Sequence, residues 1–356
     1  MAEESGDSRS VAQVKRAEAD DEEKEQTAKK QKLSSSEDEK KRSHSPETSF
    51  PTTLEGFKYH FNADGHLRHI ETDERFEFEV RKDDPKYNQK RYEALGEVIT
   101  EYVYDLLETE VGLKRITVPE DASQDEAKGF IFATKSIFKE TDKVLVLIHG
   151  DGVVRAGQWA RRLIINDCLD SGTQLPFIKR AKQMGYELLV LNSNLNKAVA
   201  ADGREELVRG SSTSKQHVIY VWDHFLAKSP VESVAFVAHS YGGVSTLNLA
   251  LKREESFCRK VFFVAFTDSV HQMSFQNAPD SIRNWFYKNS VNWVKSDKPL
   301  DTRLSESNKD SPKLSAGTTK HEETSWKSFN SVFKSLSQRY EKKMLKWSTS
   351  KEREEL

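Results

Sequence analysis

Four long apolar runs constrain the fold of this chain more than any other feature. They cover residues 143–148, 187–191, 234–237 and 260–264 and consist mainly of valine, leucine, isoleucine and phenylalanine. Runs of this kind, without the alternation of a half-exposed strand, are typical of strands that helices bury on both faces. Helical patterns at residues 176–184, 217–227 and 241–253 lie between or after the runs. This order predicts an α/β fold, with right-handed crossovers and a mostly parallel sheet flanked by helices.

Weaker patterns surround these runs. Aromatic residues alternate at 57–61 and at 76–80, which predicts two short strands with one buried face. Helical spacing at 88–110 predicts a long amphipathic helix, and the apolar runs at 116–118 and 130–133 predict outer strands. The segment 192–214 has no periodicity and is rich in asparagine, glycine and serine, so we expect a surface loop there.

Composition sets the domain organisation. The chain has 356 residues, of which 36% are hydrophobic, and this is enough for one large domain at residues 50–340. Residues 1–49 contain no aromatic side chain and many charges, which predicts a disordered tail because too little apolar surface can be buried there. Residues 341–356 are again charged, and we expect a second tail with the character of a frayed helix.

Charge, cysteines and terminal signals narrow the class of protein. Charged residues make up 31% of the chain but the net charge is only −2, so no global basic field favours direct binding of nucleic acid. Cys168 and Cys258 lie far apart without metal-ligand spacing, so we expect two thiols, with neither a disulfide nor a metal site. No signal peptide or transmembrane-length apolar run is visible, which favours nucleus or cytosol and no membrane insertion. Basic clusters at 29–33 and 40–42 fit a nuclear import signal or a solvated tail equally well.

The third apolar run ends in the sequence Val-Ala-His-Ser-Tyr-Gly-Gly at residues 237–243. A serine between a buried strand and a helix, with small residues around it, is typical of the nucleophile elbow of α/β-hydrolases. Ser240 is therefore the candidate nucleophile. Ala238 replaces the usual first glycine of this motif, and it is still small.

A second glycine-containing turn follows the first apolar run, where His149 and Gly150 precede Asp151 and Gly152. Such a loop can offer a backbone N–H to an oxyanion, alongside the N–H of the residue after the nucleophile. The candidate donors are the N–H groups of Asp151 and Tyr241. The Asp151 carboxylate would oppose a developing negative charge, which speaks against turnover.

The remaining members of a hydrolase triad are expected after the serine, in the order acid and then histidine. Only His271 and His321 follow Ser240, and His321, in a loop near residue 320, is our candidate base. Asp268 follows the fourth apolar run and is the candidate acid, with Asp301 as the alternative.

Each of these residues also has a purely structural interpretation. Ser240 can be an inherited turn in a protein without activity, since folds outlive activities, and Asp268 can cap a helix. His149 and His239 are expected to orient backbone in their turns rather than transfer protons. Four residues of the segment 155–162 can either bind an anion or form a charged helix face: Arg155, Trp159, Arg161 and Arg162.

Taken together, four segments carry a specific resemblance: 147–166, 236–243, 267–271 and 315–329. They closely resemble the Argonaute-binding-protein-two domain family, and within it the animal cotranscriptional regulator members. The resemblance covers roughly residues 50–336, and the string Gly-Val-Val-Arg-Ala-Gly-Gln-Trp-Ala-Arg-Arg at 152–162 is its most specific part.

The resemblance implies a role in protein interaction rather than a defined reaction. It implies Argonaute-type, chromatin and splicing proteins as partners, in RNA silencing or alternative mRNA splicing. It also implies a suspected hydrolase activity with Ser240 as nucleophile, and the site residues themselves predict an ester or thioester as the substrate. The last four residues, 353–356, resemble a weak retrieval signal of the endoplasmic reticulum, which is the secondary alternative to nucleus and cytoplasm.

Overall fold

The computed structural model describes residues 49–135, 143–304 and 310–354, and residues 51–356 belong to one compact unit. The tail predicted at 1–49, with both basic clusters, therefore lies outside the described residues except for Ser49. Residues 355 and 356 of the C-terminal signal lie outside them as well.

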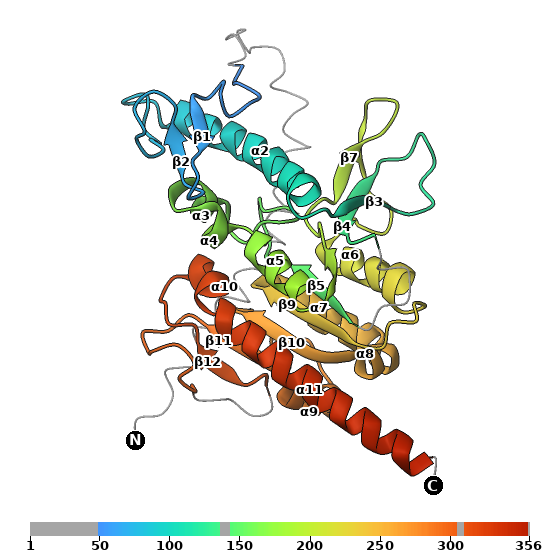
Figure 1. Cartoon of the computed structure of the whole chain (residues 1–356). Helices are drawn as coiled ribbons and strands as arrows, with labels where there is room; N and C mark the ends of the chain where they lie inside the picture. Colours follow the sequence, from blue (N-terminus) through green and yellow to red (C-terminus); the bar gives the residue numbers. More distant parts are fainter. Residues whose placement is uncertain (1–48, 136–142, 305–309, 355–356) are drawn as a thin grey trace. The chain divides into compact units, whose positions relative to one another are not determined.

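An eight-stranded sheet forms the centre of the unit (Figure 1). Its spatial order is β12-β11-β10-β9-β5-β6-β4-β3, and all neighbouring pairs are parallel except β3–β4 and β4–β6. The strands are β3 (Lys114–Val118), β4 (Gly129–Ala133), β5 (Val144–Ile148), β6 (Glu187–Val190), β9 (Val234–His239), β10 (Val261–Thr267), β11 (Ser290–Val294) and β12 (Lys313–Ser315). The fold is that of an α/β-hydrolase, as the sequence predicts.

Helices cover both faces of this sheet, which explains why its central strands are continuously apolar. Val144, Val146 and Ile148 of β5 contribute to a core with α6 (Ser214–Val221), α7 (Tyr241–Lys252), α8 (Glu254–Lys260) and α9 (Asp280–Asn289). Leu145 and Leu147 point to the opposite core, which contains α2 (Pro85–Thr109), α5 (Leu175–Gln183) and α11 (Phe329–Glu354). Alternate residues of each strand thus meet different layers of helices.

Helix α2 lies close to the helical segment predicted at 88–110. It begins after Asp84, whose carboxylate accepts the N–H of Tyr87, and Pro85 occupies its first position. Leu95, Ile99, Val103 and Leu107 are buried at four-residue spacing along one face. Shorter helices, α3 (Arg161–Asn166) and α4 (Leu169–Gly172), follow the loop after β5.

The strand predicted at 76–80 is wrong. Residues 76–80 form no strand, and the isolated bridge to the N-terminal hairpin, β1 (Tyr59–Phe61) and β2 (Leu67–His69), joins Arg68 to Arg75, which precedes them. Phe76 and Phe78 instead place their rings against Tyr92 of α2, with centroid distances of 6.0 and 5.9 Å. The aromatic alternation therefore serves packing onto a helix rather than pairing in a sheet.

The loop expected at 192–214 contains a small hairpin. Its strands, β7 (Lys197–Val199) and β8 (Glu205–Leu207), pair antiparallel. Between them Gly203 has a φ of 82°, and Asp202 accepts the N–H of Arg204. Polar residues on both faces of the hairpin hide the period of two that a strand usually shows. The helix predicted at 217–227 begins at Ser214 and changes to a π-helical turn at Trp222–Leu226.

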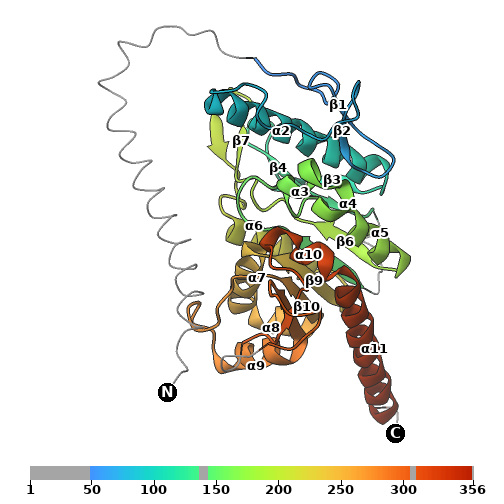
Figure 2. The same ribbon diagram turned by 90° about the vertical axis from the view of Figure 1, so that its left-hand side faces the viewer.

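The C-terminal part of the domain consists of β12, a 3-10 turn (His321–Glu323), α10 (Thr324–Lys327) and α11. The boundary expected at residue 340 falls inside α11, which continues to Glu354 as one helix of 26 residues (Figure 2). Among the described residues, no helix is long and apolar enough to cross a bilayer.

Candidate active site

Ser240 lies in the sharp turn between β9 and α7, as predicted. Its φ of 51° and ψ of −121° belong to a region that non-glycine residues rarely adopt. The turn is held by hydrogen bonds from the N–H of Ser240 to the carbonyl of Thr267 and from the N–H of Gly243 to the carbonyl of Ser240, both 3.1 Å long. The side chain of Ser240 is half-buried at the carboxyl edge of the sheet.

The small residues around the turn are required by close contacts. A Cβ atom at Gly242 would lie 2.7 Å from the carbonyl oxygen of His149, and one at Gly243 would lie 1.8 Å from Ser269 Oγ. Ala238, the departure from the usual motif, is fully buried between Ile148 of β5 and Phe266 of β10. The elbow geometry is therefore complete with alanine at this position.

Asp268 and His321 meet at the same edge of the sheet. The distance from His321 Nδ1 to Asp268 Oδ2 is 2.6 Å, and the two side chains are 38% and 12% exposed. The other carboxylate oxygen of Asp268 accepts the N–H of Lys295 at 3.1 Å, and its own N–H donates to the carbonyl of Trp293. These contacts fix a carboxylate that can orient the imidazole.

Asp301, the alternative acid, has other partners. One of its carboxylate oxygens accepts Trp293 Nε1–H at 2.8 Å, and the other accepts the hydroxyl of Ser331 at 2.6 Å. Asp301 therefore links β11 to α11, and it is Asp268 that contacts His321.

His271, the other imidazole after Ser240, is enclosed in the protein. Its two ring nitrogens lie 2.7 Å from Ser269 Oγ and 3.1 Å from Ser311 Oγ. Burial lowers the pKa of His271 to about 3, because the charged ring would lose its hydration. A base that stays neutral and has both nitrogens engaged is unsuited to take a proton from Ser240.

His239 connects the elbow to His321. Its ring centroid is 4.7 Å from that of His321, and its Nδ1 lies 2.8 Å from the carbonyl oxygen of Thr267. Burial lowers the pKa of His239 to about 3, so the ring is a neutral support for His321. Among the described residues Ser240 Oγ makes no hydrogen bond, so the structure joins His321 to Asp268 but not to Ser240.

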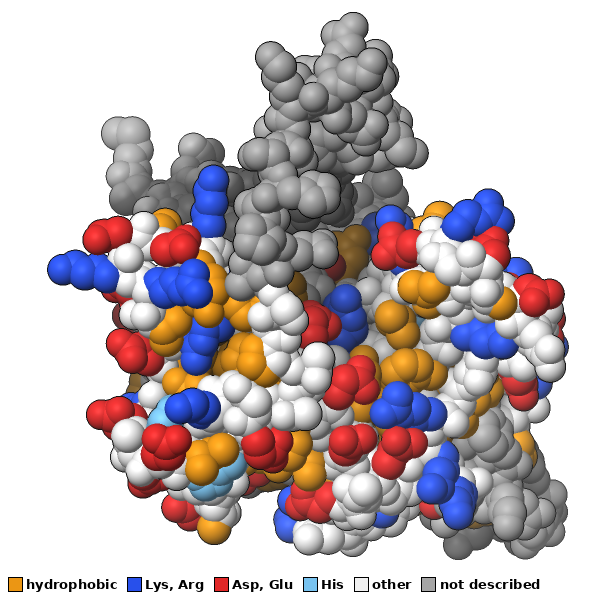
Figure 3. All heavy atoms as spheres, turned by 90° about the horizontal axis from the view of Figure 1, so that it is seen from above, with side chains coloured by type: hydrophobic (Ala, Val, Ile, Leu, Met, Phe, Trp, Pro, Cys, Tyr) orange, Lys and Arg blue, Asp and Glu red, His pale blue; other side chains and the backbone are white. Residues whose placement is uncertain are grey.

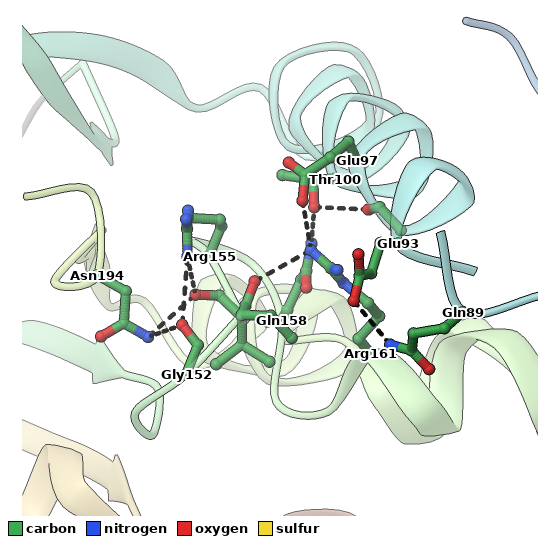
Figure 4. Close-up of polar contacts among 12 residues, drawn as sticks. Gln89, Glu93, Glu97, Thr100, Gly152, Arg155, Gln158, Arg161 and Asn194 are labelled. Carbon is green, nitrogen blue, oxygen red and sulfur yellow. Dashed lines mark hydrogen bonds and ion pairs between the residues drawn. The ribbon is translucent and has the colours of Figure 1, made fainter. Parts of the chain in front are cut away.

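The loop after β5 lies directly against the candidate nucleophile. A Cβ atom at Gly150 would be 3.0 Å from Ser240 Cβ and 3.5 Å from Ser240 Oγ, so a side chain here would require Ser240 or the loop to shift. Asn194 Nδ2 donates to the carbonyls of Gly150, Gly152 and Val154 at 3.0–3.1 Å, and the guanidinium of Arg155 donates to the last two (Figure 4). These contacts fix the backbone of the loop.

The two candidate oxyanion donors remain available for a ligand. Among the described residues, neither the Asp151 N–H nor the Tyr241 N–H has a hydrogen-bond acceptor. Asp151 is exposed, and its Oδ1 accepts the N–H of Gly152 at 2.7 Å. Its carboxylate is thus engaged by its own loop.

The arginines and the tryptophan near this loop have internal partners. Arg161 is 5% exposed and donates to Glu97 of α2 at 3.0 Å (Figure 4). Trp159 is buried in the core. Arg155 binds its own loop, and Arg162 is exposed, 3.6 Å from Glu322. These contacts account for the charges of the three arginines, whereas Arg161 Nε and Trp159 Nε1 are buried without a hydrogen-bond partner among the described residues.

Sequence analysis missed two supports of this site. Asn194 occupies a polar segment without periodicity, and its partners are 40 or more positions away in the sequence. Thr267 accepts the elbow N–H through its carbonyl and bonds Ser325 Oγ with its hydroxyl at 2.8 Å. The position of Asn194 shortly after strand β6 is the one sequence signal that indicates its role.

An elbow serine, an Asp–His pair and a glycine loop at the carboxyl edge of this sheet define a protein of the α/β-hydrolase class. A family model described as the Arb2 domain matches residues 50–300. The chain belongs to the Arb2-domain family.

Similar proteins align with most of the chain. This chain is 44% identical over 381 residues to the human cotranscriptional regulator ARB2A, and the alignment covers 94% of this chain and 92% of that protein. It is 45% identical over 350 residues to the mouse cotranscriptional regulator ARB2A, covering 85% and 84% of the two chains. Among solved structures, a histone deacetylase from Saccharomyces cerevisiae has a TM-score of 0.47 and 17% identity, covering 69% of this chain and 98% of its own.

Proposed function

We propose that this chain is a cotranscriptional regulator that uses an α/β-hydrolase scaffold to bind Argonaute-type proteins and chromatin or splicing proteins, in the nucleus and cytoplasm. The observation that carries this proposal is its identity of 44% to a protein named cotranscriptional regulator over nearly the full length of both chains. Alternative splicing and RNA silencing are the processes that we assign to it.

The face of the domain seen in Figure 3 favours protein partners over direct binding of nucleic acid. Figure 3 shows acidic and basic side chains interspersed over one face of the domain, without a continuous basic track. Binding to a phosphate backbone depends on such a track, because each phosphate contact needs a cation. The net charge of −2 is in keeping with this picture.

Affinity purification tests the regulator function. The tagged full chain is expressed at low level, recovered separately from nuclear and cytosolic extracts after ribonuclease treatment, and its co-purifying proteins are identified by mass spectrometry. We expect Argonaute-type and chromatin or splicing proteins with the wild type, and also with Ser240→Ala, since a docking role does not need the hydroxyl. Their absence from both extracts would contradict the proposal. Recovery from the endoplasmic reticulum alone would contradict the localisation.

A second function, hydrolysis of an ester or thioester, is favoured by one geometric observation. Asp268 orients His321 at 2.6 Å at the edge where Ser240 occupies its strained turn. In the proposed reaction Ser240 Oγ attacks the acyl carbon and its proton passes to His321 Nε2. The N–H groups of Asp151 and Tyr241 donate to the oxyanion. His321 then gives the proton to the leaving alcohol or thiol, and water releases the acid by the same route.

Labelling with a fluorophosphonate probe tests this reaction. We expect labelling of the wild type near neutral pH, none with Ser240→Ala, and rates lower by on the order of 10²–10⁴ with His321→Ala. Ser214→Ala is the matched control, since Ser214 is a half-buried serine bonded to Ser245 of α7. Asp268→Asn should slow labelling while Asp301→Asn should not. A folded wild type that never reacts, or equal effects of the two aspartate substitutions, would exclude the proposed triad.

A further inference from the structure

A cavity lies at the end of the sheet opposite to Ser240. It has a volume of about 470 Å³, and its lining residues come from α8, α9, α11 and the start of β10. Among the described residues, its lining contains no carboxylate and includes six cationic residues: Arg259, Lys288, Arg339, Lys342, Lys343 and Lys346. We propose that this cationic pocket binds a small polyphosphorylated molecule at a site separate from the Ser240 site.

The two sites are at different ends of one strand. Strand β10 begins at the cationic pocket with Val261 and Phe262 and ends with Thr267, whose carbonyl accepts the N–H of Ser240. A strand of 7 residues spans about 20 Å at roughly 3.3 Å per residue. A ligand that fills the cationic pocket therefore does not reach Ser240, and the pocket is a separate site.

The cations of the pocket are held in place by the fold. Arg339 donates to the carbonyl of Lys288, which joins α11 to the end of α9, and the amine of Lys343 contacts the carbonyl of Glu232. Burial lowers the pKa of both Arg339 and Lys343, because each charge is partly withdrawn from water. Two of the six charges are thus fixed within the structure.

Among the described residues, the carboxylates near this cluster lie outside its lining, and Arg259 also lines a neighbouring depression together with Glu254 and Glu255. Glu232 is the acidic residue beside Lys343, and its carboxylate is 3.7 Å from Lys260, which does not line the pocket. Glu254 lies near Cys258, and Glu341 is exposed on α11. Like charges this close raise the free energy of the empty pocket, and a ligand with several phosphate groups removes that repulsion while it binds.

Size and shape favour a small ligand over a macromolecule. A volume of about 470 Å³ falls within the range of pockets for small molecules and cofactors. One wall is aromatic: Trp285 packs edge-on against Phe257 and Phe286, with centroid distances of 5.1 and 5.0 Å, and Phe262 is nearly buried. A rigid indole beside several cations suits a molecule with an aromatic ring and several phosphate groups, such as a nucleoside polyphosphate.

Titration calorimetry with the full chain tests the proposal. The probes are ATP, AMP, inorganic tripolyphosphate and inositol hexakisphosphate, each at low and physiological ionic strength. We expect saturable one-to-one binding that weakens with salt and is tighter for the polyphosphates than for AMP. Tighter binding of ATP than of tripolyphosphate would assign the aromatic wall to a base, and equal binding would assign recognition to the phosphates alone. Both results support the polyphosphate site.

Variants on exposed positions keep the test independent of folding. Lys288→Gln and Lys342→Gln should each weaken binding by about tenfold, because each removes a charge-assisted contact. Lys334→Gln is the matched control, an exposed lysine on α11 that does not line the pocket. Trp285→Phe should abolish any ligand-induced change in tryptophan fluorescence without preventing binding. Thermal midpoints measured without ligand establish that the variants fold.

Three results would overturn the proposal. The first is the lack of saturable binding of all four probes at millimolar concentration. The second is an equal loss of affinity in Lys334→Gln and Lys342→Gln, which would indicate diffuse attraction to α11. The third is an affinity for single-stranded RNA that grows with its length and that Lys342→Gln reduces, which would identify the surface as a nucleic-acid site instead.

Discussion

Four buried histidines should make the folding of this domain sensitive to mild acid. Burial lowers the pKa of His217, His239 and His271 to about 3 and that of His149 to about 4, since none of the rings can keep its hydration when charged. His217 illustrates the cause: it accepts the N–H of Asn192 at one nitrogen and contacts Ser211 Oγ at the other. In the unfolded chain a histidine has a pKa of about 6.5.

The sign and size of the effect follow from this difference. Because the folded pKa values are depressed, the stability is fully present above pH 6.5 and is lost as the pH falls toward the folded values. Below pH 6.5 the four histidines bind protons in the unfolded state but remain neutral in the native state. Each histidine costs about 1.4 kcal/mol per pH unit, so about 2 kcal/mol at pH 5, and the four together cost about 8 kcal/mol. Since a domain is typically stable by about 5–15 kcal/mol, most of its stability should disappear between pH 6.5 and 5.

Urea unfolding at several pH values, followed by tryptophan fluorescence, measures this loss. His271→Gln should be less stable than the wild type at about pH 7, but the difference between them should shrink by about 1.4 kcal/mol for each pH unit below 6.5. A free energy of unfolding for the wild type that changes by less than about 2 kcal/mol from pH 7 to pH 5 would refute the reasoning. So would a constant difference between wild type and His271→Gln.

Three substitutions in the elbow region give further predictions. Gly242→Ala should lower the free energy of unfolding by about 1–3 kcal/mol, because the new Cβ meets the backbone carbonyl of His149 at 2.7 Å; chemical denaturation measures this, and an unchanged midpoint would contradict the contact. Asn194→Leu should slow fluorophosphonate labelling of Ser240 roughly tenfold, since it removes the donor to three loop carbonyls; an unchanged rate would show that the loop does not depend on Asn194. Ser240→Gly should raise the stability by about 1 kcal/mol or more, whereas Ser240→Ala, which keeps a Cβ, should not.

The centre of the fold could be predicted because its strands are buried on both faces. The runs at 143–148 and 260–264 correspond to β5 and β10 within a few residues. Strand β11 was not predicted, although it is a parallel neighbour of β10. Its polar Asn292 is buried because its amide bonds both the N–H and the carbonyl of Ser269, a partnership 23 positions away that no local pattern reveals.

The pairing of the candidate site residues could be predicted in part. Strand-end logic placed Asp268 at the active edge, and the structure brings it to His321 at 2.6 Å. Sequence alone left Asp301 open as the alternative acid. The choice depends on Trp293 and Ser331, whose hydrogen bonds to Asp301 exist only after β11 and α11 have assembled.

The turn at Ser240 places stability and chemistry in opposition at a single residue. A side chain in this backbone conformation holds the domain below the stability that its fold could reach. A lineage that used the scaffold only to present docking surfaces would gain stability by exchanging the serine for glycine, and it would lose nothing by doing so. In such a lineage, substitutions at position 240 would accumulate toward glycine. The residue found there in each descendant thus reports whether selection still acts on the hydroxyl.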